Sequence, residues 1–150
     1  MEITLGITAI KEDMILKSHL ELETEENLDK KWYARVDEDK KDELDRAIMN
    51  AGADLEALCW RWLEATYVRA EDDALEASNL VFNLNFSRRR TAEKAKQLAN
   101  AMHAYIVDDA LAKFYDTVEA QDLSEQHAKN AQAQAQVITH IIYSKLPPIV

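Results

Sequence analysis

Histidine and acidic side chains are the groups in this 150-residue chain that most readily bind metals, and their spacing argues against a metal site. A carboxylate-bridged di-iron bundle needs inward glutamates on two helices and a Glu-x-x-His motif on two more. The sequence contains no Glu-x-x-His motif, and the nearest acids, such as Glu125 beside His127, stand at spacings that point to different faces of a helix. We therefore predict no metal site and interpret the four histidines as surface or partly buried residues: His19, His103, His127 and His140.

Two adjacent carboxylates, Asp108 and Asp109, interrupt the apolar face of an expected helix. Paired carboxylates can serve acid–base catalysis or hold a divalent ion. Adjacent helical residues diverge by about 100 degrees, so these two do not naturally converge on one ligand. Asp109 also has Lys113 one turn further on, at the spacing of a routine ion pair. We predict no catalytic residue here, and Asp108 is instead a candidate for a buried polar contact.

The only cysteine, Cys59, lies in the aromatic run ALCWRWL and cannot form an internal disulfide. No histidine stands at helical spacing to act as its base, which favours a packing role over nucleophilic chemistry. Its neighbours Trp60 and Trp62 point to nearly opposite faces of a helix. Both cannot face one core, so one of them is a candidate anchor for an interface with another protein.

Three consecutive arginines, Arg88, Arg89 and Arg90, open an expected helix, where positive charge opposes the helix macrodipole. One interpretation is a solvated turn, or pairing within the chain with the acidic residues Glu71, Asp72, Asp73 and Glu76. The alternative is a contact with a phosphate group or a protein partner, which makes the arginines a second candidate interface. The sequence has no Gly-rich phosphate loop, nucleophile elbow or zinc-ligand spacing, so we predict no cofactor.

The composition favours one helical domain that spans residues 1–150. Apolar residues make up 47% of the chain, enough for a core, and two glycines and two prolines are too few for a many-stranded β fold. A formal net charge of -10 argues against a nucleic-acid partner, because phosphate binding requires positive charge. The acidic start of the chain is unlike a signal peptide, and no apolar run approaches the roughly 20 residues that span a bilayer. An intracellular location without a membrane partner is expected.

Apolar periodicity predicts a mainly α domain that is similar to a four-helix bundle. The expected helices cover residues 9–22, 40–68, from 87 or 91 to 118, and from Ser124 to the prolines at 147 and 148. Alternating apolar residues at 3–7 and 81–86 are typical of strands, and these two segments can pair as a small two-stranded β-ribbon. The charged stretch 23–39 is expected to connect two helices, with Trp32, Tyr33 and Val36 folding back on the body.

Each expected helix has a predicted inward face. The inward residues are Ile10, Met14 and Leu20 in the first helix, Leu44, Ile48, Ala51, Leu55, Leu58 and Trp62 in the second, Leu98, Met102, Ile106, Ala110 and Phe114 in the third, and Ala128, Ala131, Ala135, Ile138 and Ile142 in the fourth. The third helix is expected to be central. The fourth changes from small to large residues, so its alanine half permits close approach and its isoleucine half fills a wider gap.

Several segments resemble small prophage-encoded proteins of Bacteroides-type bacteria. The resemblance covers most of the chain and lies in the order of DEDKKDELDRAIMNAGADLEALCWRWL, FNLNF, AMHAYIVDDALAKFY and IIYSKLPPIV. Two patterns carry it, one at Tyr105, Leu111, Ala112, Lys113 and Phe114 and the other at Tyr143, Lys145 and Pro147. The segment ILKSHLELETEEN is also similar, more weakly, to the N-terminal part of helical head–tail connector proteins of tailed phages, which assemble as rings.

The resemblance implies a non-enzymatic, phage-derived structural or assembly protein, similar to a head–tail connector, that acts through protein contacts in the host cytoplasm or within the virion. Its partners would be other virion components or further copies of the chain. The alternative is a small cytoplasmic adaptor or regulatory protein that binds one partner through Trp60 or Trp62 and the edge at residues 88–90. An enzyme is the third hypothesis. It would need polar groups that converge in a pocket, and the sequence offers only His103, Tyr105 and Asp108 within two helical turns.

Overall fold

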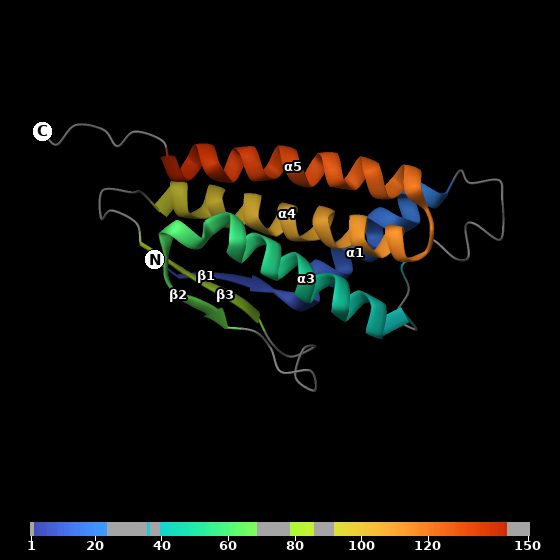
Figure 1. Cartoon of the computed structure of the whole chain (residues 1–150), viewed down its shortest axis with the longest axis horizontal. Coiled ribbons are helices and arrows are strands. Elements are labelled where there is room, and N and C mark those ends of the chain that lie inside the picture. The colour runs from blue at the N-terminus through green and yellow to red at the C-terminus, as the bar shows by residue number, and fades with distance from the viewer. Residues whose placement is uncertain (1, 24–35, 37–39, 69–78, 86–91, 144–150) are drawn as a thin grey trace, which may run out of the picture.

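The computed structural model describes residues 2–23, 36, 40–68, 79–85 and 92–143. In chain order, its elements are β1 (Glu2–Gly6), α1 (Ile7–Leu22), α3 (Lys41–Cys59), the 3-10 turn η2 (Trp60–Trp62), β2 (Leu63–Val68), β3 (Asn79–Leu84), α4 (Ala92–Thr117) and α5 (Gln121–Tyr143). The α-helices form one body with a small sheet along one side (Figure 1). The prediction of a mainly α fold with a small β element is confirmed.

The predicted pairing of the two strand-like segments is present, and a third strand joins them. The sheet is antiparallel with the order β1-β3-β2, and Ile3 lies opposite Phe82 while Leu5 lies opposite Leu80. Alternate side chains of β1 and β3 are buried, which is the pattern of a sheet with one face on a core. The buried residues are Ile3, Leu5, Leu80, Phe82 and Leu84.

The predicted helix over residues 40–68 is wrong at its C-terminal end. α3 ends at Cys59, the 3-10 turn follows, and residues 63–68 form β2. This segment has the sequence Leu-Glu-Ala-Thr-Tyr-Val, whose β-branched and aromatic residues favour a strand once β3 offers a partner. The backbone N–H of Asn85 donates to the carbonyl of Trp62 over 2.7 Å, which extends the pairing to the turn. Pairing with β3 therefore gives residues 63–68 a strand conformation, although their sequence continues the helical spacing of apolar residues.

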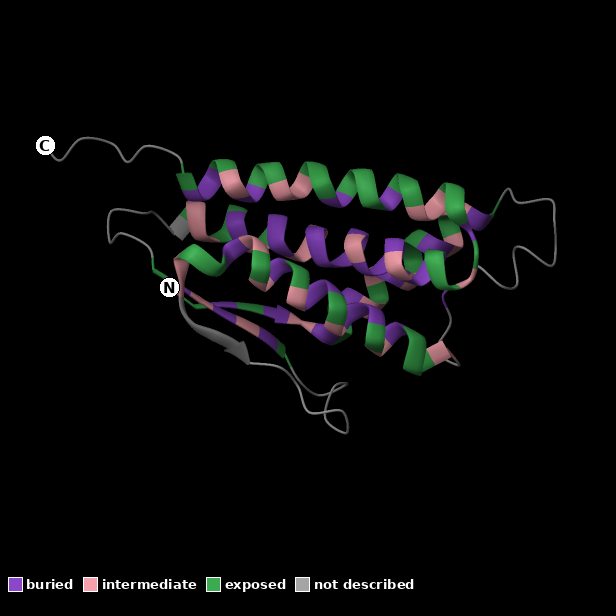
Figure 2. Ribbon diagram, viewed as in Figure 1, coloured by how far each residue is buried: buried purple, intermediate pink, exposed green. Residues whose placement is uncertain are grey.

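α4 is central, as predicted, and packs against α5, α3 and α1. Its predicted inward residues are all buried: Leu98, Met102, Ile106, Ala110 and Phe114. Figure 2 shows buried positions along α4 and on the inward sides of α3 and α5, whose outer sides are exposed. After α4 the chain reverses at Glu119, which takes the left-handed conformation at φ 60°. This reversal sets α5 beside α4 along its length (Figure 1).

The inward face of α5 differs from the prediction at its start. The helix begins at Gln121, three residues before the predicted start at Ser124, and the Ser124 hydroxyl donates to the carbonyl of Ala112 over 2.8 Å. Ala128 is exposed, whereas its neighbour His127 is buried one turn before the buried Ala131. A polar residue takes the inward position because carboxylates on two other helices, Asp108 and Glu21, contact its ring nitrogens.

α1 also differs from its predicted face. Leu20, predicted to face inward, is 60% exposed, while Ser18 and Leu22 are buried. Ser18 has a partner in the returning chain, since its hydroxyl accepts the backbone N–H of Val36 over 2.9 Å. Val36 is buried and so folds back on the body as predicted. Trp32 and Tyr33, with the rest of 24–35 and 37–39, lie outside the described residues.

Candidate functional site

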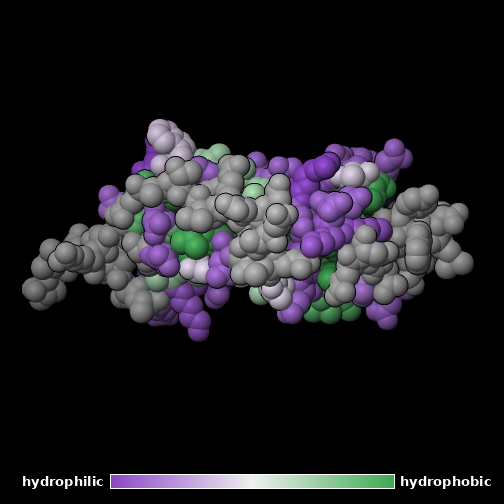
Figure 3. Space-filling view, turned by 90° about the horizontal axis from the view of Figure 1, so that it is seen from below, coloured by the Kyte–Doolittle hydropathy of each residue, from purple (hydrophilic) through white to green (hydrophobic). Residues whose placement is uncertain are grey.

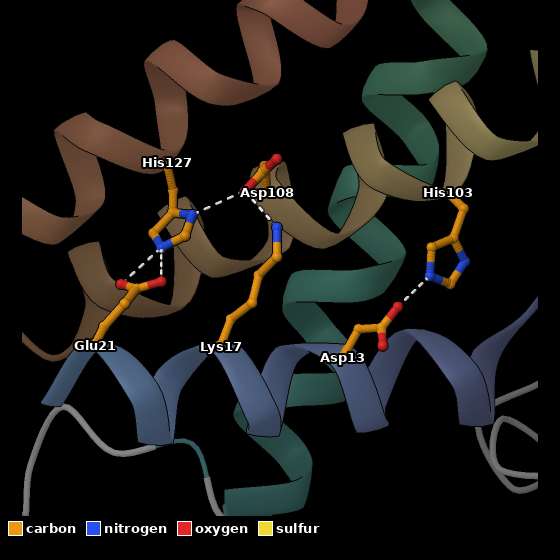
Figure 4. Close-up of polar contacts among 6 residues, drawn as sticks. All are labelled: Asp13, Lys17, Glu21, His103, Asp108 and His127. Carbon is orange, nitrogen blue, oxygen red and sulfur yellow. Dashed lines mark hydrogen bonds and ion pairs between the residues drawn. The ribbon is translucent and has the colours of Figure 1, made fainter. Parts of the chain in front are cut away.

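One side of α1 carries a row of charged side chains directed at α4 and α5. Asp13, Lys17 and Glu21 follow one another at i,i+4 spacing, so they stand on successive turns of the same helix face. Figure 4 shows all three pointing across the gap to His103, Asp108 and His127. Four of these residues are linked by contacts around His127 and are called the histidine cluster here: Lys17, Glu21, Asp108 and His127.

His127 lies between two carboxylates that come from two different helices. Its Nδ1 atom is 2.9 Å from Oδ1 of Asp108 on α4. Its Nε2 atom is 2.7 Å from Oε1 and 2.9 Å from Oε2 of Glu21 on α1. His127 and Asp108 are each only 3% exposed. The ring of one α5 residue therefore ties α5 to α4 and α1 together (Figure 4).

The position of both ring nitrogens beside carboxylate oxygens favours the positively charged form of His127. An ionised carboxylate can only accept hydrogen bonds, so both contacts are hydrogen bonds when the imidazole carries a proton on each nitrogen. Burial alone would lower the pKa of His127, but the hydrogen bonds and negative charges of Asp108 and Glu21 outweigh it and raise the pKa to about 9. His127 is therefore an imidazolium at neutral pH.

Two further residues complete the surroundings of this imidazolium. Nζ of Lys17 lies 3.4 Å from Oδ1 of Asp108, so two cations face two carboxylates in the histidine cluster. The ring of Tyr115, on α4, lies against the imidazole with centroids 5.5 Å apart. Burial raises the pKa of the Tyr115 hydroxyl, so this ring adds no charge at neutral pH. The cluster is electrically balanced and bounded by an aromatic face.

The polar residues that could have supported an enzyme do not converge. Nε2 of His103 lies 2.6 Å from Oδ2 of Asp13, away from the contacts of Asp108 with Lys17 and His127 (Figure 4). Tyr105 is buried, and burial with the nearby charges of Asp109 and Asp54 raises the pKa of its hydroxyl. His103, Tyr105 and Asp108 thus face different residues and do not surround a common point.

A second charged group joins α3 to α4. Nζ of Lys113 lies 2.8 Å from Oδ2 of Asp54 and 3.8 Å from Oδ2 of Asp109, so the expected i,i+4 contact is the longer of the two. Burial and a hydrogen bond with Asp54 raise the pKa of Asp109 to about 7, against the opposing charge of Lys113. Burial acts to raise the pKa of Asp54, but hydrogen bonds with Asp109 and Lys113 lower it. Asp109 therefore keeps its proton to a higher pH than Asp54 does.

The aromatic candidates separate as the sequence suggested. Trp60 is 66% exposed, and the guanidinium of Arg61 lies over its ring at 5.8 Å. Trp62 is half-buried, and its ring meets that of Tyr143 edge to face with centroids 4.7 Å apart. Cys59 is fully buried. The three arginines at 88–90 lie outside the described residues, so the structure places only the tryptophan part of the predicted interface.

The interpretation of all four histidines as surface or partly buried is wrong for His127. Its partners are 19 and 106 positions away, so a search for acids at helical spacing could not find them. One local signal was available. His127 stands four residues before Ala131, which belongs to the predicted inward face, so continuing that face by one turn reaches His127 as well as Ala128.

The donor atoms of the histidine cluster do not form a metal site. Asp108 and Glu21 lie against different nitrogens of the ring, so the three side chains do not surround a common point. Within the described ranges, no group of three or more histidine, cysteine, aspartate or glutamate side chains is arranged to hold a metal ion. The same part of the chain has no helix of the length and apolarity that crossing a membrane requires.

No protein-family model matches this chain, and neither the curated proteins nor the solved structures include a significant match. The resemblance to prophage proteins and to head–tail connectors therefore rests on the sequence patterns alone.

Proposed function

We propose that the protein is a non-enzymatic structural or assembly protein that acts through protein contacts. The observation that carries this proposal is the exposure of Trp60. Tryptophan is among the residues that contribute most to binding energy at protein interfaces. At 66% exposed, Trp60 has a large apolar surface available to a partner.

Other aromatic surface lies at the same end of the molecule. Tyr143 is 58% exposed and rests on Trp62, two residues after Trp60. α3 and α5 both end here (Figure 1). Trp60, Arg61, Trp62 and Tyr143 are defined here as the aromatic end surface. Tryptophan, tyrosine and arginine are the residue types enriched at the centres of protein interfaces, so its composition fits an interaction surface.

The charged residues between the helices support the non-enzymatic part of the proposal. Lys17, Glu21, Asp108 and His127 are engaged with one another, and Lys113 is engaged with Asp54 and Asp109. Groups in such contacts join the helices α1, α3, α4 and α5. We assign them a structural role.

The resemblance to prophage proteins suggests the setting of an assembling virion, in which the chain would contact other virion components or further copies of itself, as head–tail connectors do. Sedimentation velocity of the full chain over a wide concentration range tests this proposal. An assembling component should show species well above the 17.2 kDa of one chain as concentration rises. A monomer at every concentration would contradict self-assembly.

A small adaptor or regulatory protein that binds one partner in the cytoplasm is the second candidate. The separation of the exposed apolar residues favours it. The exposed large apolar residues of the described chain lie on different elements, with Leu16 and Leu20 on α1, Trp60 after α3, and Val137 and Tyr143 on α5. Figure 3 shows part of this hydrophobic surface beside hydrophilic side chains. A small aromatic surface suits one modest interface better than it suits an obligate assembly, whose faces are broad and apolar. A persistent monomer in sedimentation would favour this candidate over the first.

A further inference from the structure

The contacts of α1 are unevenly distributed along its length. In its N-terminal half Ile7, Ile10 and Met14 are fully buried. In its C-terminal half Leu16 and Leu20 are exposed, and the buried residues are Ser18 and Leu22. Apolar burial therefore fastens the first half of α1 more strongly than the second. Polar contacts of Lys17 and Glu21 with α4 and α5 carry a larger share of the attachment of the second half.

We propose that His127 is a proton-dependent latch, whose doubly protonated ring holds the C-terminal half of α1 against α4 and α5 and whose loss of one proton releases Glu21. The basis is the position of both ring nitrogens against carboxylate oxygens on separate helices (Figure 4). A neutral imidazole has one N–H and one lone pair, so it can donate to only one of the two carboxylates.

The burial of the two carboxylates decides which contact breaks. The side chain of Asp108 is 5% exposed, whereas that of Glu21 is 23% exposed. An ionised carboxylate that loses its partner in a buried position is strongly destabilised, while one that can reach water is not. The remaining proton therefore stays on Nδ1 toward Asp108. The lone pair on Nε2 then faces the negative charge of Glu21, and Glu21 moves into solvent.

The groups around His127 set the direction of the response. In the described part of the chain, α1 contributes Glu21 and Lys17, and α4 contributes Asp108 and the neutral Tyr115. On α5 itself no charged residue stands three or four positions from His127. The two carboxylates and their hydrogen bonds raise the pKa of the ring to about 9, against burial. The latch is therefore closed at neutral pH and opens in alkaline solution.

Two measurements on the full chain, labelled with nitrogen-15, test the latch from pH 6 to pH 10.5. Ring nitrogen shifts of His127 report its protonation, and amide hydrogen exchange, corrected for its intrinsic dependence on pH, reports opening of α1. We expect both nitrogens to be protonated at pH 7.5. As one proton leaves near pH 9, opening of residues 17–22 should rise by about tenfold or more relative to residues 7–14, the effect of losing one charged hydrogen bond.

Two variants make the test specific. Glu21→Gln removes the released charge, so residues 17–22 should already exchange faster at pH 7.5 and lose the alkaline step. His103→Gln alters the other histidine contact between α1 and α4, to Asp13, and should leave the alkaline step of residues 17–22 in place. A neutral His127 ring at pH 7.5, or unchanged opening of residues 17–22 while the ring loses its proton, would overturn the proposal.

Discussion

Nδ1 of His127 lies 2.9 Å from Oδ1 of Asp108, in a contact that joins α5 to α4 where each residue is only 3% exposed. α4 and α5 are neighbours in the chain and pack along their length, so apolar contacts already hold them together. The buried pair adds a constraint that apolar packing lacks. A hydrogen-bonded charge pair is satisfied in one register only, so it specifies how α5 lies on α4.

Removing one partner of this pair should destabilise the fold. Asp108→Ala leaves the His127 imidazolium buried without its α4 partner and should lower the free energy of unfolding by about 3–5 kcal/mol. Asp108→Asn keeps an oxygen that can accept from Nδ1 but removes the charge, so its loss should be smaller. Urea denaturation at pH 7 measures both. Equal stability of Asp108→Ala and the wild type would show that the contact does not contribute to folding.

The carboxyl pair at the α3–α4 contact makes a prediction about pH. The pKa of Asp109 in the folded protein, about 7, lies above its ordinary value of 3.8. A raised pKa favours folding most below pH 3.8, and this contribution is lost as pH rises through about 7. Asp109→Asn stays neutral at all pH values, so it should be more stable than the wild type at pH 8, by about 1 kcal/mol.

Unfolding midpoints of the wild type and Asp109→Asn at pH 5 and pH 8 measure this difference. Asp116→Asn removes an exposed carboxylate from the same helix and is the matched control for the loss of one negative charge. If Asp109→Asn gains nothing at pH 8 relative to pH 5, then the pKa of Asp109 is not raised in the folded protein.

Cys59 should be unreactive in the folded protein. It is fully buried, and burial raises the pKa of its thiol to about 12. A thiol reagent needs the thiolate, so labelling at pH 8 should be slow in buffer and fast in urea. The variant that carries both Cys59→Ala and Ala128→Cys, with its thiol at an exposed position of α5, should react rapidly without urea. Fast labelling of native Cys59 would place it at an accessible site.

Truncation of Trp62 should lower the stability of the fold, whereas truncation of Trp60 should leave it almost unchanged. Trp62→Ala removes a half-buried ring and its edge-to-face contact with Tyr143, which should cost about 1–2 kcal/mol of stability. Trp60→Ala removes a mostly exposed ring, so stability should change by no more than about 0.5 kcal/mol. Thermal unfolding of the two variants measures both effects. A large loss in Trp60→Ala would assign that residue to the fold and not to an interface.

Local periodicity was sufficient to predict a helix whose buried residues recur regularly along its length. The inward residues of α4 recur every three or four positions and are all buried, and the alternation in residues 3–7 and 81–86 predicted the pairing of β1 with β3. β2 was missed because Leu58 and Trp62 continue the helical spacing of α3. Only the neighbouring strand β3, distant in sequence, makes the extended conformation more favourable.

The site was less predictable than the fold because its contacts join distant parts of the chain. Asp108 could be suspected, since a carboxylate on an apolar face needs a partner. Its actual partners, Lys17 and His127, are 91 and 19 positions away, and no periodicity encodes those distances. Trp60 was identifiable in part, because two tryptophans on opposite faces cannot both be buried. The sequence could not decide which one is exposed, since this depends on the turn that follows α3.

The central claim is that the protein is an assembly component that associates with further copies of itself through its aromatic end surface. Sedimentation velocity of the wild type, Trp60→Ala and Leu20→Ala over the same concentration range tests it most directly. Leu20 is 60% exposed but lies on α1, so its variant is a matched control for loss of exposed apolar surface. We predict concentration-dependent species for the wild type and Leu20→Ala and a shift toward monomer for Trp60→Ala. A wild type that stays monomeric throughout, or equal association of all three proteins, would contradict the claim.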